Sequence, residues 1–188
     1  MRRAAVDKEA RILEAVLTLL ARRGISGVSM RAVASEANVA LGLVNYYYED
    51  KTSLIAAALR RVEEHDLTIV GPDAALDPEE RLRAALRRVA DPEFLTTEYL
   101  SLRLQLWALA QADEAFAHIN TAAQKRYRAG LASLIRMARP ALARTECNRR
   151  AADIDVLQNG IWLTALLGLD RASIQRNVRR SEEIALGN

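Results

Sequence analysis

Apolar residues recur at helical spacing along almost the whole chain, and few residues interrupt the pattern. In the first stretch Ile12, Val16, Leu19 and Leu20 share one side of a helix, and Gly24 follows two arginines where that helix would end. Only 8 glycines and 4 prolines occur among 188 residues, so most of the chain lacks the residues that break helices. The sequence therefore predicts an all-α protein.

Residues 29–48 have the order of a helix-turn-helix. Ser29 is a good N-cap for a short helix that runs to about residue 37. Asn38 follows, and asparagine tolerates the left-handed backbone that a tight turn between two helices often needs. A third helix is expected over about residues 40–47, and Asp50 can cap a fourth that begins at Lys51 and runs to about residue 70. Domains of this kind place the second helix of the pair in the major groove of DNA.

This stretch resembles the TetR family of repressors over residues 24–54. The resemblance is carried, at the family's spacing, by Gly24, Met30-Arg31-Ala32-Val33-Ala34, Ala37-Asn38-Val39-Ala40, Gly42, Tyr46-Tyr47-Tyr48, Lys51 and Leu54. Asn38 replaces the family's usual turn glycine, and Ala40 replaces its capping serine, a loss worth about 1 kcal/mol of binding. The resemblance implies a three-helix DNA-binding domain over residues 1–54 and a helical ligand-binding and dimerisation domain over residues 55–188.

Residues around the turn and the third helix are the candidates for DNA contact: Ser29, Arg31, Ala40, Leu41, Gly42, Leu43, Asn45, Tyr46, Tyr47 and Lys51. Gly42 has no side chain to hold the backbone away from DNA. Leu41 and Leu43 can touch thymine methyl groups but cannot hydrogen-bond to purines. Arg31 and Asn45 are therefore the best candidates for polar contact with bases.

The neighbouring tyrosines and the lysine suit a different role. Tyr46, Tyr47 and Lys51 would hydrogen-bond phosphates, which sets the register of a protein on DNA without reading its sequence. Simple core packing is the alternative for the tyrosines. The resemblance favours the core for Tyr48, because an aromatic core residue occupies that place in the family.

Further helices are expected after residue 71. Asp77 followed by Pro78 is a strong helix start, and Asp91 with Pro92 repeats it. Leucines alternate between residues 99 and 109, yet the lack of β-branched residues favours a central helix over a strand. A long helix is expected from residue 114 to about 143, ended or kinked by Pro140, and others over 153–169 and 171–185.

The C-terminal part loosely resembles the BetI-like branch of the family. That resemblance is carried by Phe94-Leu95, Trp107, Phe116, Arg126-Tyr127-Arg128 and Gly160-Ile161-Trp162-Leu163, and it implies sensing of small organic metabolites such as choline derivatives. Bulky aromatic residues among small ones leave cavities where the aromatic side chains do not fill the space, and such a cavity can bind a ligand. Six residues are therefore candidates for effector contact: Tyr99, Arg103, Trp107, Phe116, Tyr127 and Trp162. The alternative is that the aromatics are ordinary core.

A homodimer is expected on two grounds. The resemblance implies an interface made by the helices 114–140 and 153–169. Function also requires a pair, because one short recognition helix buries too little surface for tight and specific binding to double-stranded operator DNA.

Other classes of protein find little support. The net charge of +3 is weak evidence for any partner. The chain has no Cys/His pair at workable spacing, no phosphate-binding glycine loop and no HExxH, so we expect no enzyme, no cofactor and no metal site. Cys147 is the only cysteine and no stretch is apolar enough to span a membrane, which favours the cytoplasm.

The sequence thus predicts a transcriptional repressor that a small-molecule effector releases from a palindromic operator. The alternative is a helical dimeric protein that binds small molecules or partners and has lost specific DNA binding. Leu41, Leu43 and the missing cap at Ala40 keep this alternative open.

Overall fold

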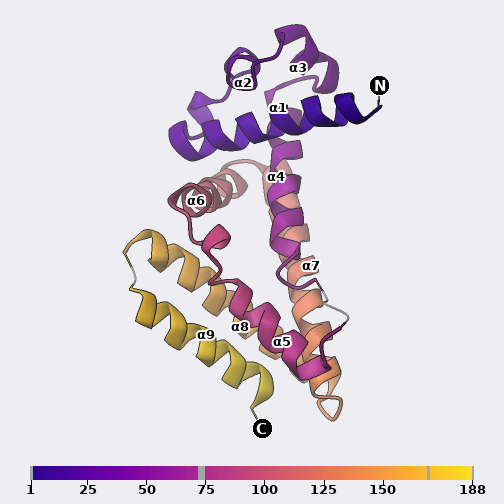
Figure 1. The fold of residues 1–188 in the computed structure, drawn as a ribbon, viewed down its shortest axis with the longest axis vertical. Coiled ribbons are helices and arrows are strands. Elements are labelled where there is room, and N and C mark those ends of the chain that lie inside the picture. The colour runs from indigo at the N-terminus through magenta and orange to yellow at the C-terminus, as the bar shows by residue number, and fades with distance from the viewer. Residues whose placement is uncertain (1, 72–74, 169, 188) are drawn as a thin grey trace. The chain divides into compact units, whose positions relative to one another are not determined.

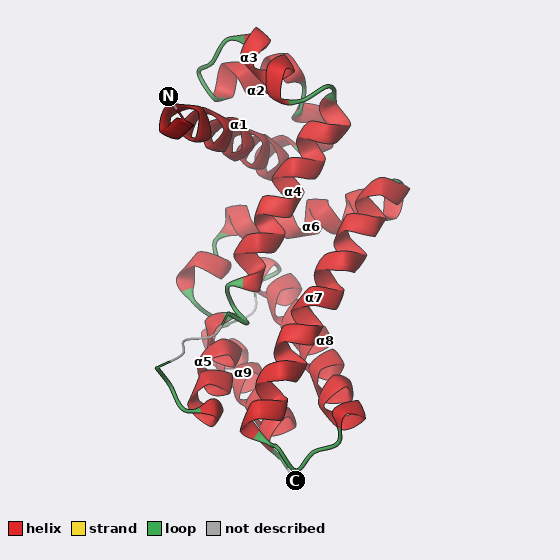
Figure 2. Cartoon of the chain, turned by 90° about the vertical axis from the view of Figure 1, so that its right-hand side faces the viewer, coloured by secondary structure: helices red, strands yellow, loops and turns green. Residues whose placement is uncertain are grey.

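The computed structural model describes residues 2–71, 75–168 and 170–187, with side chains from Lys8 onward (Figure 1). Throughout these ranges the regular structure is helical and no strand occurs, which confirms the all-α prediction (Figure 2). The elements are α1 Arg2–Arg23, the 3₁₀ turn η1 Ile25–Gly27, α2 Met30–Glu36, α3 Leu41–Tyr47, α4 Lys51–Leu67, α5 Pro78–Arg88, the 3₁₀ turn η2 Pro92–Phe94, α6 Thr97–Ala112, α7 Glu114–Ala138, α8 Arg144–Leu166 and α9 Arg171–Leu186.

The chain divides into two compact units. The first contains residues 1–64 and 101–120, and the second contains residues 65–100 and 121–188. Three helices, α4, α6 and α7, therefore contribute residues to both units.

The core of the first unit forms where α1, α2, α3 and α4 meet. The side chains of Ile12, Leu20, Val33, Val44 and Leu54 are fully buried there. Figure 1 shows α2 and α3 lying over one side of α1. Each fully buried aliphatic side chain contributes on the order of 1.5–3 kcal/mol through the hydrophobic effect. This packing fixes the orientation of two helices that are too short to be stable alone.

Three polar residues set the starts of α2 and α4 and the turn between α2 and α3, as the sequence predicts. The Ser29 hydroxyl accepts a hydrogen bond from the Ala32 amide, 3.1 Å away, at the start of α2. Asn38 has a φ of 52° in the turn between α2 and α3. The Asp50 carboxylate accepts from the Ser53 amide, 2.7 Å away, and this bond together with one from the Ser53 hydroxyl lowers the pKa of Asp50.

In the second unit α8 packs along α9, and α5 packs against α9. Glu182 on α9 joins Arg83 and Arg87 of α5 through ion pairs of 2.9 and 2.8 Å. On α7, a Cβ at Gly130 would lie 2.7 Å from a methyl carbon of Val70. Glycine is therefore required where α7 passes the segment that follows α4.

Two helix starts differ from the sequence prediction. Asp91 forms no side-chain cap and Pro92 begins only the short turn η2, so α6 starts later, at Thr97. The helix expected from residue 153 begins at Arg144 instead, because Glu146 pairs with Arg149 and Arg150 and because Cys147 is buried. At the end of α7, Ala138 is the last helical residue, as a proline at 140 requires.

Candidate nucleic-acid interface and aromatic cluster

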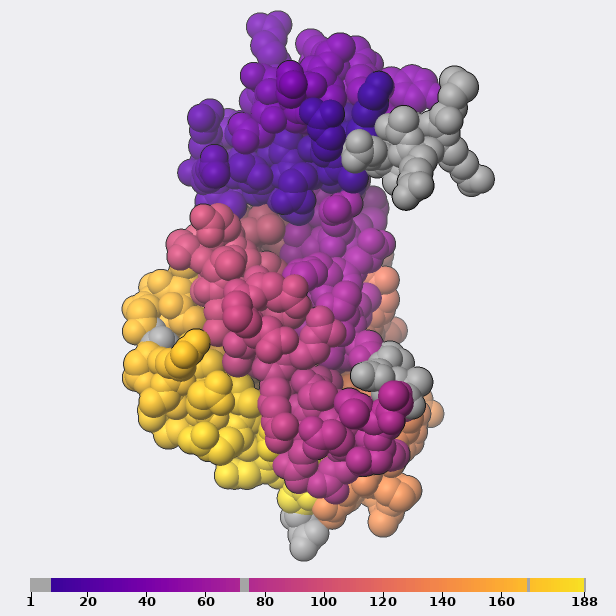
Figure 3. Space-filling view, in the orientation of Figure 1, coloured from indigo at the N-terminus to yellow at the C-terminus, as the bar shows by residue number. Residues whose placement is uncertain are grey.

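The two sides of α3 differ sharply in exposure. Val44 and Tyr48, the residue after the helix, are buried in the core of the first unit, whereas Leu41 is 36% exposed and Tyr46 is 81% exposed. A Cβ placed on Gly42 would meet no atom within 4 Å. The space-filling view shows the chain's indigo and purple segments, which include α2 and α3, on the surface of this unit (Figure 3). The exposed side of α3 is thus shaped by small, apolar and aromatic residues.

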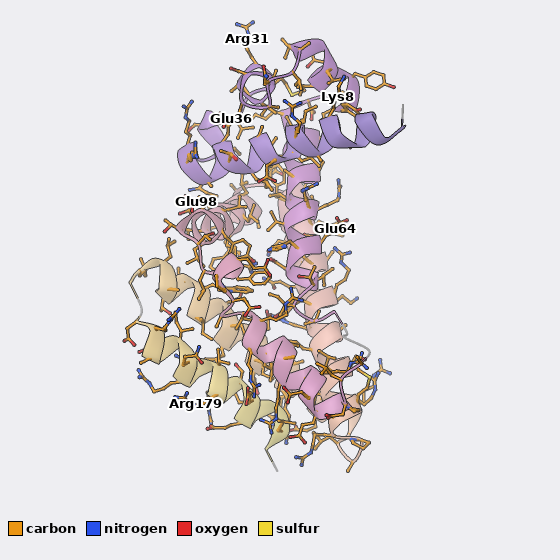
Figure 4. The ribbon with its side chains drawn as sticks, in the orientation of Figure 1. Lys8, Arg31, Glu36, Glu64, Glu98 and Arg179 are labelled. Carbon is orange, nitrogen blue, oxygen red and sulfur yellow. The ribbon has the colours of Figure 1, made fainter. Side chains whose placement is uncertain are left out.

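Arg31 and Asn45 both lie at the surface. Arg31 extends away from α2 into solvent (Figure 4), and among the described residues it makes no hydrogen bond or ion pair. Ser29 and Ala40 are exposed N-caps of α2 and α3, but Ala40 offers no side-chain hydrogen bond. Leu43 is half-buried. All the candidates on α2 and α3 belong to the first unit, in which these two helices pack against each other.

Tyr47 and Lys51 are half-buried at the junction of α3 and α4. The ring of Tyr47 meets that of Tyr46 edge-on, with 5.4 Å between centroids. The Lys51 ammonium group donates a hydrogen bond to the carbonyl oxygen of Ile25, 2.7 Å away. This contact holds the lysine next to the N-terminus of α4, where the helix dipole favours negative charge.

Tyr48 lies in the core, as the sequence predicts. Its hydroxyl donates to the Glu9 carboxylate on α1, 3.1 Å away. Burial, with Glu9 adding to it, raises the pKa of Tyr48 well above the usual value. Tyr48 thus stays neutral and fastens the end of α3 to α1.

Sequence reasoning missed one residue of this surface, Arg11. Its guanidinium donates to the carbonyl oxygen of Ala37 at 2.6 Å and reaches that of Asn38 at 3.5 Å. The contact joins residues 26 positions apart, so no local pattern in the sequence could indicate it. Arg11 braces the turn between α2 and α3 from α1.

Four ring side chains form an aromatic cluster in the second unit: His65, Phe94, Tyr99 and Trp162. His65 stacks on Phe94 with 4.7 Å between ring centroids, and Tyr99 meets Trp162 edge-on at 6.1 Å. Phe94 also contacts Tyr99 at 5.5 Å and Trp162 at 6.4 Å. The Trp162 indole nitrogen donates to the carbonyl oxygen of Val89, 3.0 Å away. Only Tyr99 and Trp162 of the cluster were among the sequence candidates.

A carboxylate lies at the edge of this aromatic cluster. The Tyr99 hydroxyl donates a hydrogen bond to Asp66, which neighbours His65 in the last turn of α4. A carboxylate attracts a positively charged group by its charge, and the faces of neighbouring aromatic rings attract the same group by cation–π interaction. The arrangement also ties the end of α4 to α6.

The remaining effector candidates are divided between the units. The guanidinium of Arg103 lies 5.6 Å from the centroid of the Trp107 ring, and both residues belong to the first unit with the buried Phe116. Tyr127 lies in the second unit, and its hydroxyl donates to Gln158 at 2.8 Å. The structure thus brings Tyr99 together with Trp162 and Arg103 together with Trp107.

Along α8 and Leu167, the residue that follows it, an apolar stripe faces solvent. Val156 is 67% exposed, Leu163 39% and Leu167 77%. Gly160 lies between them at helical spacing, and a Cβ there would meet no atom within 4 Å. Apolar side chains in such a row indicate a surface that another protein can cover.

In the described part of the chain, no three His, Cys, Asp or Glu side chains gather closely enough to hold a metal ion. No helix within the same ranges combines the length and the apolar character that crossing a membrane requires.

An all-helical chain with an exposed recognition helix after a tight turn has the features of a transcription regulator of the helix-turn-helix class. Residues 12–58 match the tetR family of bacterial regulatory proteins, and residues 78–184 match the C-terminal domain of BetI-type transcriptional repressors. The chain therefore belongs to the TetR family, as its sequence motif predicts.

Individual relatives agree with this assignment. The transcriptional regulator BetI of Burkholderia thailandensis is 30% identical over 85% of this chain and 82% of its own length. A crystal structure from Pseudomonas aeruginosa PAO1 is 27% identical, with a TM-score of 0.83 over 95% of this chain and 88% of that one. A regulator from Saccharomonospora viridis in complex with choline is 22% identical, with a TM-score of 0.77 over 97% of both chains.

Proposed function

We propose that this regulator is a cytoplasmic homodimeric repressor that binds a palindromic operator and leaves it when a small organic cation enters the C-terminal domain. The proposal rests on α3: one side of this helix is buried in the core, and the opposite side is exposed and can face DNA. Residues 1–54 read DNA in this scheme, and residues 55–188 bind the effector and dimerise.

The DNA contacts divide into two groups. Arg31 and Asn45 hydrogen-bond to bases, since both are exposed polar side chains. Tyr46, Tyr47 and Lys51 contact phosphates and set the register, with the α4 N-terminus adding its dipole. The exposed Tyr46 ring supports this, because a large aromatic side chain at 81% exposure gains by covering part of a partner.

The dimer uses α8 together with the C-terminal part of α7, which overlap the ranges 153–169 and 114–140 that the sequence singled out. The apolar stripe of Val156, Gly160, Leu163 and Leu167 supports a two-fold contact in which one stripe meets its own copy. Gly160 would let the two helices approach closely at the centre of that stripe.

The effector binds at the aromatic cluster. Tyr99, Trp162 and the Asp66 carboxylate suit a quaternary ammonium or similar cation, and the choline bound by the Saccharomonospora viridis protein agrees with this class. His65 and Asp66 belong to α4, whose other end carries Lys51. A ligand that rearranges the cluster therefore acts on a helix that begins in the DNA-binding domain, and it favours a conformation in which the two recognition helices no longer match the half-sites.

Fluorescence anisotropy of the purified chain on its own upstream intergenic DNA, against a scrambled duplex, tests this function. We expect saturable binding that favours the native fragment and weakens steeply with salt. Choline is the first effector to be added to the complex of protein and DNA. Tetramethylammonium is its matched control, because it keeps the quaternary ammonium group and lacks the hydroxyl. Equal weak binding to both duplexes at every salt concentration would instead favour a ligand-binding protein that no longer reads DNA.

A further inference from the structure

We infer that α3 reads an A·T-containing step, with a thymine methyl group against Leu41 and an adenine against Asn45. The inference rests on the proposed function, because it requires α3 to lie in the major groove. It goes further by naming the bases that the operator must contain beneath this helix.

The chemistry of the exposed residues of α3 carries the inference. The helix has the sequence Leu-Gly-Leu-Val-Asn-Tyr-Tyr, which contains no arginine, lysine, glutamine or carboxylate. Guanine is read best by arginine or lysine, and cytosine by a carboxylate. Asparagine is the side chain that pairs its amide with N6 and N7 of adenine, and an apolar side chain finds its partner in the thymine methyl group. The exposed side of α3 is therefore suited to A·T pairs.

The geometry places the two contacts close together. Leu41 and Asn45 are four residues apart, so they share one side of α3 and lie about 6 Å apart along its axis. Base pairs are stacked about 3.4 Å apart. The thymine and the adenine are thus within about two base pairs of each other in each half-site.

Two further observations favour close approach at this place. Leu41 is an apolar residue left 36% exposed, and it gains by being covered. Gly42, the next residue, has open space where a side chain would stand, so the backbone can come near the groove floor.

The test begins with selection of binding sites from a random duplex library by the full chain. Enrichment of a palindrome supports the proposed function, and absence of any enriched sequence would overturn both it and this inference. In the enriched site each thymine is then replaced by deoxyuridine, which removes only the methyl group. Each adenine is separately replaced by 7-deazaadenine, which removes the N7 acceptor.

We expect one symmetric pair of uracils to weaken binding about fourfold per half-site. One symmetric pair of 7-deazaadenines should weaken it about tenfold per half-site. The variant Leu41→Ala should bind the thymine and uracil sites equally, and Asn45→Ala should bind the adenine and 7-deazaadenine sites equally. Arg60→Met, an exposed residue of α4 outside the candidate surface, is the control, and it should keep both discriminations.

Circular dichroism and thermal unfolding verify that each variant folds. A selected half-site with only G·C pairs beneath α3 would refute the inference while leaving the proposed function intact. So would equal binding of thymine and uracil sites by the unchanged protein, or a methyl effect that survives in Leu41→Ala.

Discussion

Arg11 on α1 donates a hydrogen bond to the carbonyl oxygen of Ala37 at the end of α2, with 2.6 Å between Nη2 and the oxygen. The next residue, Asn38, takes the left-handed conformation that turns the chain into α3. The turn of the helix-turn-helix is therefore held by α1 as well as by its own residues.

Replacing Arg11 by methionine removes the guanidinium and keeps most of the apolar stem. We expect the free energy of unfolding in urea to fall by about 1 kcal/mol, since the Ala37 carbonyl loses its charged donor. Operator affinity should fall as well, because the turn orients α3. Lys8→Met, one turn earlier on α1, is the control. An unchanged urea midpoint in Arg11→Met would show that water replaces the brace without loss.

Replacing Lys51 by methionine tests the phosphate contact. The slope of log binding constant against log salt concentration should become shallower by about 1 for each protomer, and affinity should fall alike on every operator sequence. Arg60→Met, an exposed cation farther along α4, is the control and should leave the slope unchanged. If Lys51→Met kept the full slope, the ammonium group would serve only its bond to the Ile25 carbonyl.

Replacing Leu163 by arginine tests the dimer. A charge in the apolar stripe of α8 would be buried opposite its own copy, so we expect monomers by light scattering and a large loss of operator affinity. Leu104→Arg on α6 is a matched control outside the proposed interface, because Leu104 is 43% exposed and Leu163 is 39% exposed. If Leu163→Arg remained a dimer with unchanged helical content, the interface would lie on another surface.

The ion pairs of Glu146 predict a dependence of stability on pH. Hydrogen bonds from Arg149 and then Arg150 lower the pKa of Glu146 to about 2. Since the folded-state pKa lies below the unfolded value of about 4.3, this contribution is fully present above the unfolded pKa and is lost as pH falls toward 2.

Between pH 5 and pH 2, thermal unfolding of Glu146→Gln should therefore respond less to pH than that of the unchanged protein. Glu36→Gln is the control, because Glu36 is exposed and is joined to no cation among the described residues. Parallel pH profiles for the Glu146→Gln variant and the unchanged protein would argue against the predicted contribution.

Local signals in the sequence predicted the ends of several helices correctly. Ser29, Asp50 and Asp77 accept the amide hydrogen bonds expected of N-caps. Asp91 has a similar local sequence but caps nothing, and α8 begins nine residues before its apolar pattern suggests. At the start of α8 the ion pairs of Glu146 with Arg149 and Arg150 outweighed the apolar pattern.

The sequence predicted the helix-turn-helix more completely than it predicted the aromatic cluster. The motif from Gly24 to Leu54 predicted the helix-turn-helix, because its spacing reflects one local arrangement of short helices. The aromatic cluster was predictable only in Tyr99 and Trp162. His65 and Asp66 lie in the last turn of α4, and nothing nearby in the sequence points to a partner on α6.

The sequence by itself determined the helical class, the order of the helices and the recognition motif, since helix propensity, capping and periodicity act between residues a few positions apart. Only the tertiary structure decided that Arg11 braces the turn, that Asp66 accepts a hydrogen bond from Tyr99 and that Val156 and Leu163 stay exposed. Those outcomes depend on which helix surfaces meet, and burial against a distant segment sets them.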